Sequence, residues 1–66
     1  MALGGILSED QVAARYQVAA PTVRGWRRKR TGPRYFYAGR RVRYRLADLL
    51  AWEEAEAMKT AQKKAS

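Results

Sequence analysis

The chain has 66 residues, 14 of them lysine or arginine and 6 of them aspartate or glutamate, which gives a net charge of +8 at neutral pH. A chain of this length forms one small domain, and we expect it to be cytoplasmic. No apolar run approaches the roughly 20 residues that a membrane-spanning helix needs, so no membrane partner is expected. Cysteine and histidine are both absent, which excludes disulfides, typical zinc sites and the common nucleophile–base pairs, and we expect no cofactor, no small-molecule substrate and no enzymatic activity.

A first helix is expected from about Ser8 to Tyr16. Ser8 can cap its first turn, and Gln11, three residues later, can complete a capping box. Leu7 and Val12 occupy the hydrophobic positions that flank such a start, and the acidic residues of the first turn suit the positive end of the helix dipole. These local signals agree on where the helix begins.

A second helix is expected from Ala20-Pro21 to about Arg30, because proline is tolerated in the first turn of a helix. Val23 and Trp26 are three residues apart and face the same way. About four residues separate the two helices, and two short helices joined by so short a turn are typical of a helix-turn-helix.

Two strands are expected next, over residues 34–38 and 41–45, around a turn at Gly39-Arg40. Because a lone hairpin is marginal in water, it should pack against the helices. We expect an apolar inner face and a largely basic outer face. The inner set is Phe36, Ala38, Val42 and Tyr44, and the outer set is Tyr35, Tyr37, Arg41, Arg43 and Arg45.

A third helix is expected from Leu46 to about Met58, with Leu49 and Trp52 on its core side. Residues 59–66 are small and polar and are expected to form a flexible basic tail. Residues 1–58 are thus predicted to be an α+β, mostly helical domain: a small winged helix-turn-helix with the order helix, helix, two-stranded hairpin wing, helix.

Charge is segregated along the chain. Ten basic residues and no acidic residue lie between Arg24 and Arg45, interleaved with aromatic and aliphatic residues. The acidic residues are expected on the first and third helices, away from the basic side that the second helix and the hairpin form. This distribution is typical of a domain that binds nucleic acid.

Two segments resemble a known family. The run Val18–Arg28 is similar to the turn and recognition helix of the MerR-like winged helix-turn-helix group, and the run Gly39–Arg45, followed by Asp48-Leu49 and Ala51-Trp52, is similar to its wing and closing helix. Within that group the chain most resembles the small phage excisionases, also called recombination directionality factors. The resemblance covers about residues 6–55.

The chain departs from the family pattern at four positions. Gln17 stands where the family often has glycine, Ala19 and Ala47 stand where it often has serine, and Gly25 replaces a large polar residue of the recognition helix. A missing serine cap weakens a helix start by about 1 kcal/mol. Gly25 removes one side chain that could read bases or lets the backbone approach DNA closely.

The resemblance implies that the recognition helix enters the major groove of DNA and that the wing reaches the adjacent minor groove. Major-groove contacts are then expected from Thr22, Arg24 and Arg28, and minor-groove contacts from Arg40 and Arg41. Contacts to the DNA backbone are expected from Arg27, Lys29, Arg34, Tyr35, Tyr37, Arg43 and Arg45.

The resemblance also implies a function, because an excisionase binds attachment-site DNA cooperatively, bends it and directs an integrase toward excision. The implied partners are double-stranded DNA, a phage integrase and neighbouring copies of the chain, in the nucleoid of a bacterial host cell. A small phage or bacterial transcription regulator with a MerR-like DNA-binding domain is the alternative. An RNA-binding protein is less favoured, because the aromatic residues fall on inward positions rather than exposed ones.

Overall fold

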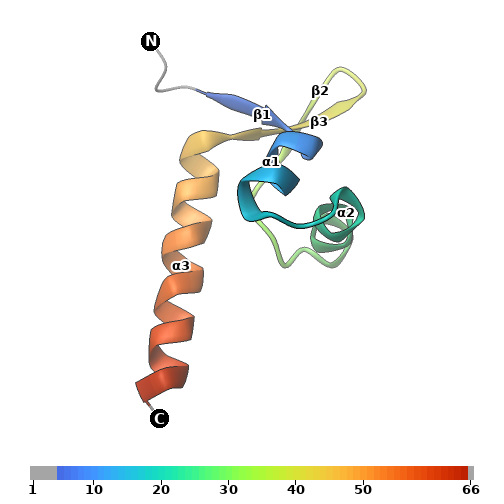
Figure 1. Ribbon diagram of the computed structural model, residues 1–66. Coiled ribbons are helices and arrows are strands. Elements are labelled where there is room, and N and C mark those ends of the chain that lie inside the picture. The colour runs from blue at the N-terminus through green and yellow to red at the C-terminus, as the bar shows by residue number, and fades with distance from the viewer. Residues whose placement is uncertain (1–4, 66) are drawn as a thin grey trace.

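The computed structural model describes residues 5–65, and the side chains among them up to residue 61. Its elements in chain order are β1 (Ile6–Ser8), α1 (Glu9–Tyr16), α2 (Ala20–Lys29), β2 (Phe36–Ala38), β3 (Arg41–Arg45) and α3 (Leu46–Ala65). Figure 1 shows the sheet at one end of the molecule, α1 and α2 beside it, and α3 leaving it as one long helix. The domain is a small, mostly helical winged helix-turn-helix, which confirms the predicted fold class.

α1 starts as the sequence predicts. The Gln11 amide donates to the Ser8 hydroxyl at 3.2 Å, and the Ser8 amide donates to the Gln11 side-chain oxygen at 2.8 Å, so both halves of the capping box are formed. Gln17 ends the helix in a left-handed backbone conformation, with φ 57°. The Val18 amide then reaches back to the Ala13 carbonyl at 2.9 Å, which closes the last turn.

α2 follows after a short turn, and Pro21 lies in its first turn as expected. Ala19 has the extended backbone of an N-cap, with φ −76° and ψ 149°, but its side chain makes no capping hydrogen bond. Arg30 ends the helix in a left-handed conformation, with φ 59°. The two helices of the predicted helix-turn-helix are therefore both present, and the second starts without a side-chain cap.

The sheet has three antiparallel strands in the order β1-β3-β2, where the sequence predicted two. The additional strand, β1, pairs Leu7 with Tyr44, and beyond it the Leu46 amide donates to the Gly5 carbonyl at 2.8 Å. Three residues are too few to show an alternating pattern, and the partner strand lies far along the chain, so periodicity cannot reveal β1. This strand ties the start of α1 to the start of α3.

The pairing of β2 with β3 corrects the expected faces of the hairpin. Ala38 pairs with Arg41 across a two-residue loop, in which Gly39 has φ +67°. Paired residues in antiparallel strands have their side chains on the same face of the sheet. The expected inner face, with Ala38 and Val42 together, would need a three-residue loop, so the faces predicted for residues 35–38 were wrong. The inner face carries Tyr35, Tyr37, Val42 and Tyr44, and the outer face carries Phe36, Ala38, Arg41, Arg43 and Arg45.

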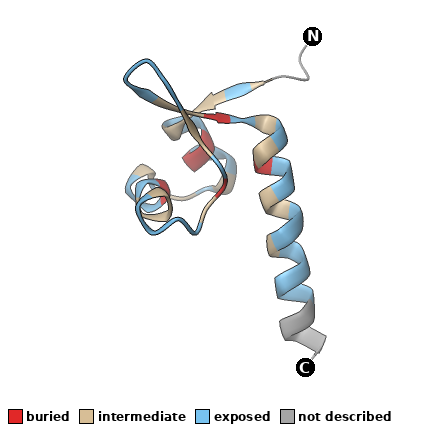
Figure 2. Ribbon diagram, turned by 180° about the vertical axis from the view of Figure 1, so that it is seen from behind, coloured by how far each residue is buried: buried red, intermediate tan, exposed pale blue. Residues whose placement is uncertain are grey.

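The core lies where the sheet, α1, α2 and the first turns of α3 meet (Figure 2). Its buried hydrophobic residues are Val12, Ala13, Val23, Tyr44 and Leu49. Beside it lies an aromatic cluster in which each helix contributes one ring, with centroids 5.2 to 5.9 Å apart; its members are Tyr16, Trp26 and Trp52. Each helix is therefore held to the others by packing, and the orientation of α2 relative to the wing is set by the core.

α3 continues to Ala65, so the expected end near Met58 was wrong. Most of the residues after Met58 are alanine, lysine or glutamine, which are strong helix formers. Glu53 joins this helix to α1, because its carboxylate accepts hydrogen bonds from Arg15 and from the Tyr16 hydroxyl, each at 2.6 Å. Over residues 5–65, none of the helices combines the length and the apolar character needed to cross a membrane.

Candidate nucleic-acid interface

α2 and the wing, which comprises β2, β3 and the loop between them, form one basic side of the molecule. An open groove of about 540 Å³ lies between them, beside the first turn of α1. The arginines that line this groove are Arg24, Arg40, Arg41 and Arg43, and the residues from the start of α1 are Ser8, Glu9 and Asp10. The groove therefore joins the second helix of the helix-turn-helix to the tip of the wing.

The three candidate base-reading residues of α2 are all exposed, but they do not lie on one edge of the helix. At 100° per residue, Arg24 and Arg28 are within roughly 40° of each other, whereas Thr22 is roughly 160° from Arg24. Gly25 lies on the exposed face between Arg28 and Thr22, and a Cβ placed there would meet no atom within 4 Å. The structure thus brings two of the three candidates together and leaves open space in the middle of the exposed face.

Arg27, a candidate contact to the DNA backbone, points into the protein, and only 19% of its side chain is exposed. Its Nη2 donates to Glu9 at 3.0 Å, and its guanidinium lies 5.7 Å from the centre of the Tyr35 ring. The hydrogen bond to Glu9 raises the pKa of Arg27, and burial opposes this effect. Its buried Nε has no hydrogen-bond partner among the residues that the structure describes. Arg27 therefore connects α1, α2 and the segment before β2.

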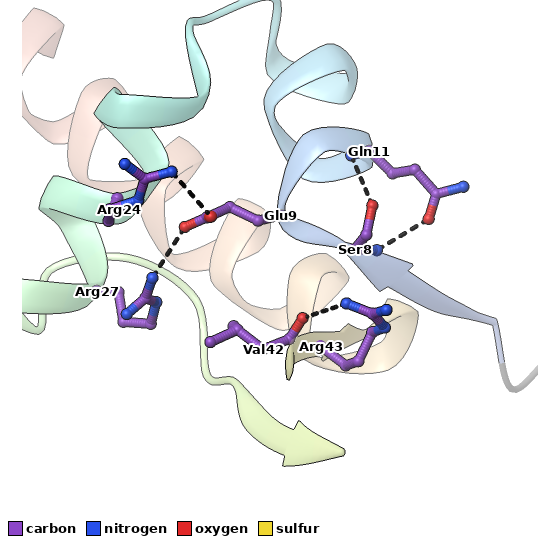
Figure 3. Close-up of polar contacts among 7 residues, drawn as sticks. All are labelled: Ser8, Glu9, Gln11, Arg24, Arg27, Val42 and Arg43. Atoms are coloured by element: carbon purple, nitrogen blue, oxygen red, sulfur yellow. Dashed lines mark hydrogen bonds and ion pairs between the residues drawn. The ribbon is translucent and has the colours of Figure 1, made fainter. Parts of the chain in front are cut away.

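Glu9 and Asp10 bring negative charge to the basic side, so the expectation that the acidic residues lie away from it was wrong for these two residues, and Glu9 is the one that pairs with arginines. Its carboxylate lies between two arginines on successive turns of α2, 3.0 Å from Arg27 Nη2 and 3.6 Å from Arg24 Nη2 (Figure 3). Sequence patterns missed this contact because α1 and α2 meet only in the folded chain. No local signal separates Glu9, which pairs with α2, from Asp10, which is exposed in the same turn.

The four arginines of the wing have different surroundings. Arg40 and Arg41 are exposed at the tip. Arg43 is partly buried, and its Nη1 donates to the carbonyl of Val42 at 2.8 Å. Arg45 is exposed on the outer face, where its guanidinium lies 4.8 Å from the centre of the Phe36 ring. The two arginines at the tip are thus the more accessible pair, and the other two are held by local contacts.

The two tyrosines that were candidates for backbone contacts also differ. Tyr35 is partly buried against the core, with its ring centroid 6.2 Å from that of Tyr44. Tyr37 lies 6.0 Å from Tyr35 and is 61% exposed. Packing accounts for the position of Tyr35, whereas the hydroxyl of Tyr37 is accessible to a ligand.

A second basic group lies at the C-terminal end of α2. Lys29, Arg30 and Arg34 are exposed there, and Arg30 and Arg34 line a pocket of about 270 Å³ with Trp26 and Pro33. Arg30 is absent from the contacts expected from the sequence. Its membership of the unbroken basic run 27–30 was the signal that could have included it.

Comparison with known proteins gives one match. A family model described as a helix-turn-helix domain matches residues 6–57, well over half of the chain. This segment contains the sheet, α1, α2 and α3 as far as residue 57, and so includes the whole groove described above. No curated protein and no solved structure gives a significant match.

Proposed function

We propose that the chain, which belongs to the helix-turn-helix domain family, binds double-stranded DNA sequence-specifically through α2 and the wing. The family is a DNA-binding one that includes excisionase-like proteins. The observation that carries the proposal is that Arg24 of α2 and the tip arginines Arg40 and Arg41 line one groove. The two grooves of a duplex are separated by a phosphate backbone, so cations on both sides of a protein groove suit a strand lying within it.

In this arrangement α2 lies in the major groove and the wing tip lies in the adjacent minor groove. Arg24 and Arg28 donate to base edges from one edge of α2, and Thr22 contacts the duplex from the other edge. Arg40 and Arg41 enter the minor groove at the wing tip. Contacts to phosphates come from the remaining side chains of the basic side, of which Arg43 is partly buried and the others are exposed: Lys29, Arg30, Arg34, Tyr37, Arg43 and Arg45. Arg27 and Tyr35 support this surface from beneath rather than contact DNA.

We further propose that the protein is an excisionase-like architectural factor, which bends attachment-site DNA and directs an integrase toward excision. A single domain of this size buries only roughly 600–1,000 Å² on DNA, so one copy specifies little sequence. Several copies bound side by side on repeated sites would supply the specificity, and such an array bends the duplex. Membership of a family that includes excisionase-like proteins supports this role.

A gel-shift titration tests both levels of the proposal, with duplexes that contain an attachment site, a promoter or random sequence, and with structured RNA. We expect a ladder of stepwise complexes on attachment-site DNA and a bend at saturation in a circular-permutation assay. Straight DNA at saturation would reject the architectural role, and a single complex at a promoter would indicate a transcription regulator. Equal binding to every duplex and to RNA would reject sequence-specific binding altogether.

One pair of charge-matched variants shows whether α2 reads bases. Arg24→Ala should weaken binding to the best duplex by about 1–3 kcal/mol, the usual cost of losing a guanine contact. Lys59→Ala removes the same charge from α3, where the side chain is 72% exposed, and should leave the affinity unchanged. Equal losses in the two variants would mean that net charge governs binding, and an equal loss of Arg24→Ala on a random duplex would mean that Arg24 contacts a phosphate rather than a base.

A further inference from the structure

Glu9 lies within the proposed DNA-binding side rather than at its edge. It is the first residue of α1, directly after the N-cap Ser8, and 19% of its side chain is exposed. One carboxylate oxygen accepts a hydrogen bond from Arg27 at 3.0 Å, and the other lies 3.6 Å from Arg24. Figure 3 shows this carboxylate between the two arginines of α2. A negative charge here affects both cations before any DNA is bound.

The two arginines are held in different ways. Arg27 is as shielded as Glu9 and also packs against Tyr35, so it stays with the carboxylate. Arg24 is 51% exposed, and its distance of 3.6 Å from Glu9 is longer than a hydrogen bond. Its guanidinium is therefore attracted to Glu9 without being fixed by it, and it lines the groove that leads to the wing tip.

Glu9 changes how favourable each kind of DNA contact is for Arg24, because a contact to a phosphate and a contact to a base affect the carboxylate differently. A phosphate competes with the carboxylate for the same cation, and moving Arg24 to a phosphate leaves a largely shielded carboxylate with one partner fewer. A guanine edge does not compete in this way, because its O6 and N7 are neutral acceptors. A guanidinium has five N–H donors, so Arg24 can donate two of them to guanine while others remain directed at Glu9.

We propose that Glu9 is a specificity-determining residue, which weakens the attraction of Arg24 to phosphates and orients it toward a base edge. Glu9 touches no DNA in this role and acts through Arg24, so it is a positioning residue. The inference rests on the proposed function, because it requires α2 to lie in the major groove. Its signature is a change in the ratio of specific to non-specific affinity, and not merely a change in affinity.

The test uses Glu9→Gln, which removes the charge and keeps the size of the side chain. Asp10→Asn is the matched control, because Asp10 is exposed in the same turn and forms no ion pair within the described residues. The wild-type chain first selects its preferred duplex from a random library. Fluorescence anisotropy then measures the affinity of each variant for that duplex and for a random one over a series of salt concentrations.

We expect Glu9→Gln to bind the random duplex roughly fivefold to tenfold more tightly at 0.1 M salt, because each added phosphate contact contributes a slope of about 0.9 in log K against log salt. The selected duplex should gain less or lose affinity, so the affinity ratio should fall, by about fivefold to tenfold where the affinity for the selected duplex is unchanged. Asp10→Asn should change both affinities by the same factor and leave the ratio intact. In an Arg24→Ala background, Glu9→Gln should no longer change the ratio.

Three results would overturn the inference: an unchanged ratio in Glu9→Gln, an equal change in Asp10→Asn, or an undiminished effect of Glu9→Gln when Arg24 is absent. Thermal unfolding checks that each variant is folded. If Glu9→Gln unfolds, Glu9→Asp supplies the same test, since it keeps the charge but withdraws the carboxylate from Arg24. A wild-type chain that selects no sequence from the library is a different result, which rejects the proposed function and the inference with it.

Discussion

At the scale of single residues, Gln17 is, with Arg30, one of two described positions where glycine would suit a left-handed backbone better than the residue present. Its left-handed backbone, with φ 57° and ψ 44°, costs a residue with a Cβ about 1–2 kcal/mol and costs glycine little. Gln17→Gly should raise the free energy of unfolding by about 0.5–1 kcal/mol, because the greater freedom of glycine in the unfolded chain offsets part of the gain. Urea unfolding followed by circular dichroism measures the change.

The control for this substitution is Ala14→Gly, at an exposed position inside α1. There glycine relieves no strain, so the free energy of unfolding should fall by about 1 kcal/mol. A loss of stability in both variants would show that the Gln17 side chain contributes more than its backbone costs. The opposite signs expected here separate a backbone effect from a general effect of glycine.

At the scale of elements, local signals predicted the helix starts and the hairpin of β2 and β3, and they missed β1 and the faces of β2. The capping box of Ser8 and Gln11 and the position of Pro21 depend on neighbouring residues only, and both starts are where these residues place them. β1 depends on long-range pairing, because Leu7 meets Tyr44 only in the folded chain, and the faces of β2 depend on the exact number of residues in the hairpin loop. For the same reason the exposed arginines of the wing tip were predictable, whereas the contact between Glu9 and Arg27 was not.

The contact between α1 and α3 is an element-scale feature that should depend on pH. Burial raises the pKa of Tyr16 to about 12, and its hydrogen bond to Glu53 adds to the effect. A tyrosine in the unfolded chain ionises near pH 10. Between about pH 10 and 12 the folded state therefore binds more protons than the unfolded state, and the free energy of unfolding should fall as the pH rises through this window.

Tyr16→Phe shows whether Tyr16 causes the fall in the free energy of unfolding at alkaline pH. The variant should lose less stability between pH 9 and pH 11.5 than the wild type, because one of the raised pKa values is gone. Part of the fall should remain, since burial also raises the pKa of Tyr44. Tyr37→Phe removes a phenol from an exposed position and serves as the control. Urea unfolding at each pH measures the free energy of unfolding. If its fall with pH became equally small in both variants, this account would be contradicted.

At the scale of the whole molecule, charge and shape are both asymmetric. The principal extents are 44 × 29 × 19 Å, and the longest reflects α3, which runs away from the sheet as one long helix (Figure 1). Glu53, Glu54 and Glu56 lie around the middle of α3, and its last turns carry lysines. A duplex that lies on α2 and the wing is therefore far from the last turns of α3, although these add to the net charge.

The salt dependence of DNA binding shows whether a cation contacts a phosphate or only adds to the net charge of the protein. If five to eight phosphates are neutralised, log K should fall with log salt with a slope of about −5 to −7. Replacing Arg40 and Arg41 with glutamine should make this slope less steep by about 1.8, because each cation contributes about 0.9. Lys63→Gln with Lys64→Gln removes the same charge from the last turns of α3 and should leave the slope unchanged. Fluorescence anisotropy of a labelled duplex over a series of salt concentrations measures the slope for each double variant. Equal changes of slope would mean that DNA also contacts the end of α3, and would contradict binding confined to α2 and the wing.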